Sequence, residues 1–105
     1  MSIFTMGIDV GSTASKCVIL KDGSEIVAKS LVAVGTGTSG PSRAIAPVLE
    51  NADMTREQMD FVLATGYGRN SLDGLADMQM SELSCHAKGA AFLFPNVRTV
   101  VDIGG

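Results

Sequence analysis

Aromatic and basic side chains are scarce in this sequence. Its 105 residues include no tryptophan, one tyrosine and four phenylalanines, and eight basic residues stand against eleven acidic ones, for a net charge of -3 at pH 7. A protein that binds a nucleic acid backbone usually concentrates Lys and Arg on one surface and stacks bases on aromatic side chains. The sequence has no such basic cluster and no aromatic row, so we expect no nucleic acid partner.

Long apolar runs and a basic leader are also missing. No apolar stretch approaches the roughly 20 residues that cross a bilayer, and the opening MSIFTMGIDV does not combine a basic region with an apolar core. Cysteine is rare, and Cys17 and Cys85 are far apart, with no CxxC and no Cys/His spacing of a metal site. These absences predict a cytoplasmic protein with two reduced thiols and no membrane contact.

Apolar, β-branched runs between turn residues predict the fold. Strands are expected at residues 3–10, 15–22, 24–34, 60–66 and 96–105, with Asp22-Gly23 as a tight hairpin turn. Helices are expected from Pro41 to Leu49, with a kink or a late start because of Pro47, and over residues 79–93. In the second helix, Cys85 falls opposite the apolar stripe, which predicts an exposed thiol unless another subunit covers it.

The order of these elements predicts the fold class. A three-strand antiparallel meander is followed by strands that helical crossovers make parallel, and this is the order of a ribonuclease H-like mixed sheet of the α/β class. No internal repeat or linker divides the chain. We therefore expect residues 1–105 to form a single domain.

GIDVGSTASKCVIL, at residues 7–20, places an acid, two glycines and hydroxyl residues between two apolar stretches. The turn is expected to be too long for the simplest hairpin, and its small side chains would expose backbone N–H groups on one side. The hydroxyls of Ser12 and Thr13 would add donors, which makes a nest for an anion such as a phosphate. The alternative is that Gly11 merely eases the turn and that the hydroxyls are solvated.

Two acidic residues support the phosphate interpretation. Asp9 lies at a strand end beside the turn, where an unpaired carboxylate would repel a phosphate, and Mg²⁺ resolves this conflict because one or two carboxylates hold it together with the phosphates. Asp102 repeats the pattern in VVDIGG, an apolar run followed by an acid and glycines. TGYGR, at residues 65–69, follows another parallel strand, where Tyr67 and Arg69 either line a ligand crevice or lie in an exposed loop.

The motifs resemble those of a known superfamily. GIDVGST followed by SK, with DIGG later, is similar to the first and second phosphate motifs of the ATPases that include actin, Hsp70 chaperones and sugar kinases. Within that superfamily, GIDVGSTASKCVIL, VGTGTSGP, LATGYGRNSL and SELSCHAKGA together resemble the ATP-dependent activators (component A) of 2-hydroxyglutaryl-CoA dehydratase and related dehydratases and benzoyl-CoA reductases. The resemblance covers nearly the whole chain.

The resemblance implies one half of an actin-like ATPase fold and a homodimer that hydrolyses ATP to ADP. In this family, ATP hydrolysis drives single electrons from an iron-sulfur cluster at the subunit interface into a partner dehydratase. The cluster cysteines of the family lie beyond Gly105, and neither Cys17 nor Cys85 matches one of them, so no 4Fe-4S cluster is expected on this chain. The chain is thus expected to be an N-terminal ATPase subdomain that stops at the second phosphate motif.

The resemblance also implies roles for single residues. Asp9 would hold Mg²⁺ through water, and Asp102 would orient Mg²⁺ or the attacking water. Lys16 either reaches a phosphate or is a solvated strand residue. The residues expected at the ATP phosphates are Gly11, Ser12, Thr13, Gly104 and Gly105.

Two other functions remain open from the sequence. The chain could be a self-associating half-fold that binds nucleotide at most and has no catalytic activity. It could also be half of a sugar or acyl kinase, which shares the same hairpin but needs a base for its hydroxyl substrate. Detectable phosphoryl transfer to a small hydroxyl compound would favour the kinase.

Overall fold

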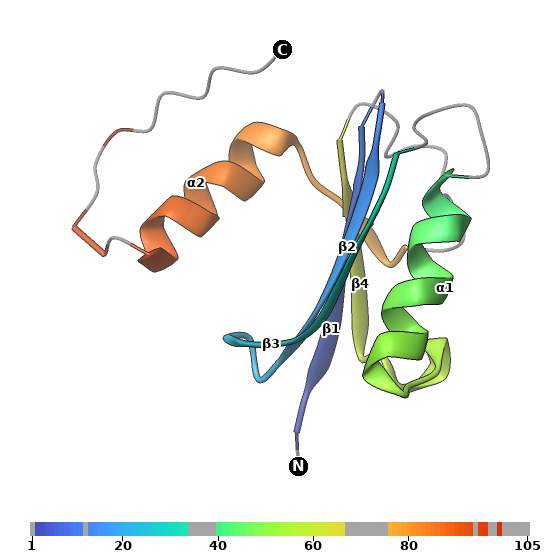
Figure 1. Cartoon of the computed structure of the whole chain (residues 1–105). Coiled ribbons are helices and arrows are strands. Elements are labelled where there is room, and N and C mark those ends of the chain that lie inside the picture. The colour runs from blue at the N-terminus through green and yellow to red at the C-terminus, as the bar shows by residue number, and fades with distance from the viewer. Residues whose placement is uncertain are drawn as a thin grey trace.

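The computed structural model describes residues 2–11, 13–33, 40–66, 76–93, 95–96 and 99. These residues form a mixed five-stranded sheet of order β3-β2-β1-β4-β5, with helices on both of its faces (Figure 1). The strands are β1 (Phe4–Val10), β2 (Ser15–Lys21), β3 (Glu25–Val32), β4 (Phe61–Thr65) and β5 (Met78–Gln79). The helices are α1 (Gly40–Ala52), the short 3-10 helix η1 (Arg56–Gln58) and α2 (Glu82–Leu93).

The predicted meander is present. β2 pairs antiparallel with both β1 and β3. The turn between β2 and β3 has positive φ at both Asp22 (54°) and Gly23 (78°), and the Ser24 N–H donates to the Lys21 carbonyl at 3.3 Å. Positive φ at both central residues matches the right-handed twist of the flanking strands, which is why an Asp-Gly pair predicts this turn.

β4 and β5 extend the sheet in parallel, as expected from the crossover order. The expected start of the second helix at residue 79 is wrong, because residues 77–80 bond along the edge of β4. The Asp77 N–H donates to the Val62 carbonyl at 2.7 Å and the Met80 N–H to the Ala64 carbonyl at 2.9 Å. Helix α2 therefore begins at Glu82. The strand expected at residues 96–105 falls largely outside the described residues.

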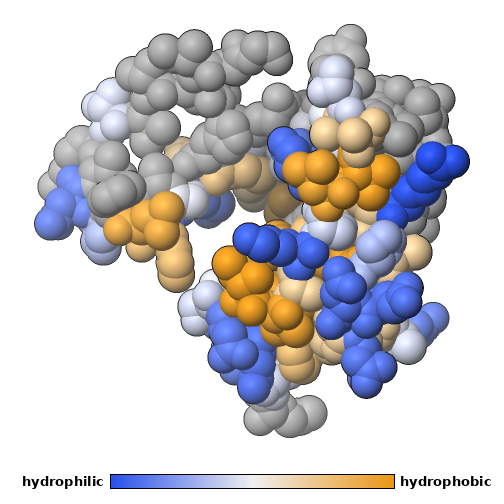
Figure 2. Space-filling model, viewed as in Figure 1, coloured by the Kyte–Doolittle hydropathy of each residue, from blue (hydrophilic) through white to orange (hydrophobic). Residues whose placement is uncertain are grey.

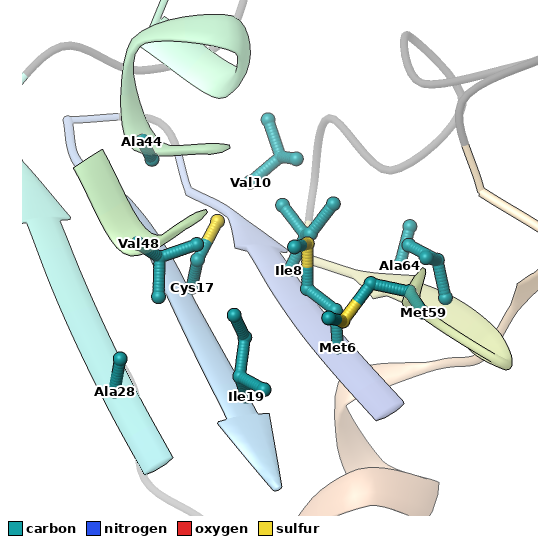
Figure 3. Packing of buried hydrophobic residues seen from close by; sticks show 11 residues of the cluster. Met6, Ile8, Val10, Cys17, Ile19, Ala28, Ala44, Val48, Met59 and Ala64 are labelled. Atoms are coloured by element: carbon teal, nitrogen blue, oxygen red, sulfur yellow. The ribbon is translucent and has the colours of Figure 1, made fainter. Parts of the chain in front are cut away.

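The described core lies between the sheet and α1. Side chains of a strand alternate between the two faces of a sheet, so every second residue faces the helix. The buried hydrophobic residues on this side are Met6, Ile8, Val10, Cys17, Ile19, Ala28, Ala44, Val48, Met59, Val62 and Ala64 (Figure 3). Full burial of a side chain such as Ile19 or Val62 contributes about 1.5–3 kcal/mol, which holds α1 against β1, β2 and β3.

Helix α1 starts at Gly40, close to the start expected at Pro41, and continues through Pro47. A late start caused by Pro47 is therefore wrong. A proline in a helix interior lacks the N–H of one hydrogen bond, and packing of Ala44 and Val48 on either side of it offsets that loss. The Ser30 hydroxyl of β3 also donates to the Ala44 carbonyl at 2.6 Å, which ties the helix to the sheet.

Helix α2 lies on the opposite side of the sheet from α1 (Figure 1). By the alternation of the strands, the side chains of Asp9, Lys16, Val18, Leu63 and Thr65 lie on this face. In the described part of the chain, no helix is long and apolar enough to span a membrane.

Candidate functional site

Asp9 is the centre of the candidate site. It lies one residue before the end of β1 and pairs in register with Lys16 on β2 and with Thr65 on β4. Lys16 Nζ is 3.6 Å from Asp9 Oδ2, and the two side chains are 53% and 38% exposed. An ion pair this exposed contributes under about 1 kcal/mol, so the carboxylate can exchange Lys16 for a cation at little cost.

A backbone hydrogen bond closes the β1–β2 turn. The Gly11 N–H donates to the Ala14 carbonyl at 2.9 Å, which leaves only residues 12 and 13 between the two bonded residues. β1 ends at Val10 and β2 begins at Ser15, so four residues join the two strands, which agrees with a turn longer than the simplest two-residue hairpin. A Cβ at Gly11 would lie 2.8 Å from the Ala14 oxygen, so the close approach of these backbones requires glycine at this position.

The hydrogen bond within the turn limits the role of Gly11 in binding a phosphate. Its N–H is already used inside the hairpin, so Gly11 acts by lacking a side chain that would push the turn open. Thr13 is an exposed residue of the turn. Ser12 lies outside the described residues.

The end of β4 packs directly against Asp9. Gly66, the residue after β4, is buried and has a φ of 95°. A Cβ at this position would lie 2.5 Å from Asp9 Oδ1 and 2.5 Å from the Val10 carbonyl oxygen. The sequence indicated a crevice at TGYGR, but it did not single out Gly66, since the requirement for glycine arises from contact with another strand.

A pocket of about 730 Å³ lies between the sheet and α2. Its polar end is formed by Asp9, Lys16 and Thr65, and its wall includes Cys85 of α2. The remaining lining residues are Gly7, Ile8, Cys17, Val18, Lys29, Ser30, Leu31 and Leu63. Figure 2 shows apolar surface on both sides of the hollow between α2 and the sheet. The volume is in the range of about 300–1,000 Å³ typical of small-molecule sites.

The two cysteines have different surroundings. Burial raises the pKa of the Cys17 thiol to about 12, and a hydrogen bond with the Ser30 side chain lowers it in part. A thiol with this pKa stays protonated at neutral pH and is a poor nucleophile. Cys85 is half-buried and lines the pocket, so its thiol is less exposed than its position opposite the apolar stripe predicts.

Several residues expected in the site lie outside the described residues. These are Ser12, Tyr67, Arg69, Asp102, Gly104 and Gly105. Among the described residues, no three or more His, Cys, Asp or Glu side chains gather as a metal cage. The structure therefore brings together Asp9, Lys16 and the β1–β2 turn. It adds Thr65, the last residue of β4, and Gly66, the residue after it, to which the sequence analysis assigned no role.

Comparison with known proteins finds close relatives. The model of the BadF/BadG/BcrA/BcrD ATPase family matches residues 6–105. The (R)-2-hydroxyglutaryl-CoA dehydratase activating ATPase of Acidaminococcus fermentans is 78% identical over 105 residues, which are 100% of this chain and 40% of that protein. The activator of lactoyl-CoA dehydratase from Anaerotignum propionicum is 54% identical over 103 residues, or 98% of this chain and 39% of that protein.

Solved structures match the fold. The crystal structure of component A of the Acidaminococcus fermentans dehydratase has a TM-score of 0.90 at 78% identity, over 98% of this chain and 40% of that one. The activator of 2-hydroxyisocaproyl-CoA dehydratase from Clostridium difficile, with bound ADPNP, has a TM-score of 0.89 at 51% identity, over 98% and 38%. The chain thus spans about 40% of the length of these relatives. The match confirms the predicted fold class.

Proposed function

The chain belongs to the BadF/BadG/BcrA/BcrD ATPase family, and we propose from this membership that it binds the phosphates of Mg·ATP at the β1–β2 hairpin. In this proposal it is the phosphate-binding part of an ATPase that activates a 2-hydroxyacyl-CoA dehydratase. The relatives named as activators of dehydratases support the partner class, and the bound ADPNP of one structural relative supports a nucleotide ligand.

The observation that carries the proposal is the position of Asp9. Its carboxylate lies between the ammonium of Lys16 on β2, 3.6 Å away, and the backbone of Gly66, the residue after β4. It also faces an open pocket next to the β1–β2 turn. A phosphate placed against this turn would meet the negative charge of Asp9 unless a cation lay between them.

The donor set fits Mg²⁺. Mg²⁺ usually keeps several waters and binds one or two carboxylates together with substrate phosphates. A single carboxylate beside an open pocket matches that requirement, and a cage of protein ligands is not needed. When bound, Mg²⁺ would neutralise the phosphate charge. Asp9 would hold the hydrated ion, Lys16 would move from Asp9 to a phosphate oxygen, and Thr13 would add a hydroxyl from the turn.

Other parts of the proposal rest on residues outside the described ranges. Ser12 would join the phosphate contacts of the turn. Asp102 would orient Mg²⁺ or the attacking water, and Gly104 and Gly105 would open the second phosphate loop. Hydrolysis of ATP, transfer of electrons to the dehydratase and location in the cytoplasm are proposals of the same kind, and we propose no 4Fe-4S cluster on this chain.

Calorimetric titration of the chain with ATP and Mg²⁺ tests the site. We expect saturable binding that requires Mg²⁺ and that Asp9→Asn weakens at least tenfold, because the variant keeps the shape of the side chain but loses the charge that holds the cation. Asp53→Asn is the matched control, since Asp53 is exposed beyond the end of α1 and its φ of 54° suits asparagine. No binding at millimolar ATP, or equal binding by Asp9→Asn, would refute the proposal.

We also propose that the chain forms a homodimer, which exposed apolar side chains support. Leu31, Phe92 and Leu93 are 66%, 63% and 68% exposed, and a second copy of the chain would cover such apolar side chains. Light scattering should give the mass of two chains, with one ATP bound per two chains. The mass of one chain at all concentrations would contradict self-association without affecting the phosphate site.

A further inference from the structure

Thr65, the last residue of β4, has a hydroxyl with no evident structural role. Its Oγ1 is buried and, among the described residues, has no hydrogen-bond partner. Buried polar side chains are hydrogen-bonded in the large majority of cases, so an unpartnered hydroxyl requires an explanation. The β-branched shape of the residue suits a strand, but valine would supply the same shape without the unpaired hydroxyl.

The position of Thr65 points to the candidate site. Thr65 pairs in register with Asp9 across the parallel β1–β4 ladder, and adjacent strands are about 4.8 Å apart. Both residues line the same pocket. The next residue, Gly66, approaches Asp9 so closely that a Cβ would be 2.5 Å from Oδ1. The unpaired hydroxyl thus belongs to the residue that neighbours the carboxylate on the β4 side.

We propose that Thr65 is a ligand-binding residue of the Mg·ATP site. Rotation about its Cα–Cβ bond turns the hydroxyl into the pocket beside Asp9, where it hydrogen-bonds an oxygen of the Mg·triphosphate group. That oxygen belongs either to a phosphate or to a water on the cation. Asp9 then faces Lys16 on the β2 side and Thr65 on the β4 side of the ligand. This inference rests on the proposed function, since it assigns a residue of the same site.

The free chain and the nucleotide complex are expected to respond oppositely to Thr65→Val. The variant removes a buried unpaired hydroxyl, so the free chain should melt at the same temperature as the wild type or a few degrees higher. In the complex the hydroxyl has a partner, so Mg·ATP should bind about 5- to 30-fold more weakly. A residue with only a structural role would not lose affinity while keeping or gaining stability.

The experiment combines calorimetric titration with Mg·ATP and thermal melts of the free chains. Thr65→Ser keeps the hydroxyl and should bind within about twofold of the wild type. Thr5→Val is the matched control, because Thr5 lies on the same face of β1, four residues before Asp9, and does not line the pocket. If Thr65→Val fails to fold, Thr65→Ser and Thr65→Ala replace it as a pair that differs by the hydroxyl, and weaker binding by the alanine variant is expected.

The outcomes separate the two proposals. If the wild type binds no Mg·ATP, the proposed function fails and this inference fails with it. If the wild type binds and Thr65→Val binds equally well, the inference alone is overturned. A titration with Mg²⁺ alone identifies the oxygen, since weaker Mg²⁺ binding by Thr65→Val indicates a cation-bound water and equal Mg²⁺ binding indicates a phosphate oxygen.

Discussion

Replacing Gly66 by alanine tests whether the backbone after β4 lies directly against Asp9 and Val10 of β1. Two costs are expected. The φ of 95° at Gly66 is unfavourable for an L-residue by about 1–2 kcal/mol. The added Cβ would also lie 2.5 Å from Asp9 Oδ1 and from the Val10 carbonyl oxygen, and forcing extra volume into a packed region costs about 1–3 kcal/mol. Together these two costs predict that Gly66→Ala lowers the free energy of unfolding by about 2–5 kcal/mol.

Alanine variants of two other glycines distinguish the cost of backbone strain from the cost of the steric contact. Gly23 has a φ of 78°, but a Cβ there would meet nothing within 4 Å, so Gly23→Ala should lose only the backbone contribution of about 1–2 kcal/mol. Gly89 lies in α2 with open space around it, and Gly89→Ala should stabilise the chain by about 0.5–1 kcal/mol. The difference between the Gly66 and Gly23 variants therefore measures the contact with Asp9 and Val10.

Urea denaturation and thermal melts measure the three variants. A domain of this size loses about 4–8 °C in melting temperature per kcal/mol, so Gly66→Ala should melt about 8–40 °C below the wild type. The variant should also bind Mg·ATP more weakly, because the new methyl group displaces the Asp9 carboxylate. If Gly66→Ala is no less stable than Gly23→Ala, the close approach of β4 to Asp9 is not present in the protein, and the argument for the site fails.

Two further predictions concern the core. Ser30→Ala removes the 2.6 Å hydrogen bond to the Ala44 carbonyl and should destabilise the chain by about 1 kcal/mol in urea denaturation, whereas an unchanged midpoint would mean that the bond does not fasten α1. Because burial raises the pKa of Cys17 from 9.0 to about 12, the unfolded chain loses this proton first, so stability should fall as pH rises from 9 toward 12, by up to about 1.4 kcal/mol per pH unit. Urea denaturation at several pH values should show a flatter dependence in Cys17→Ala, and identical slopes in variant and wild type would contradict the assignment.

Local patterns in the sequence determined the framework of the fold. Apolar, β-branched runs predicted β1, β2 and β3, and the Asp22-Gly23 turn followed from two residues that tolerate positive φ. The position of Asp9 near the end of β1 and the family resemblance were also readable from the sequence. These features depend on neighbouring residues in the chain, so side-chain periodicity and turn chemistry are sufficient to predict them.

Contacts between distant segments were decided only by the tertiary structure. Residues 78–79 became a strand because the free edge of β4 offered hydrogen bonds, although their side chains suit a helix equally well. The Gly11 N–H was taken up by Ala14, Cys85 was turned toward the pocket, and Asp9 gained Lys16 as a partner. Gly66 and Thr65 reach Asp9 through a parallel pairing of strands more than 50 residues apart. Such pairings depend on register and packing across the whole sheet, so no local pattern encodes them.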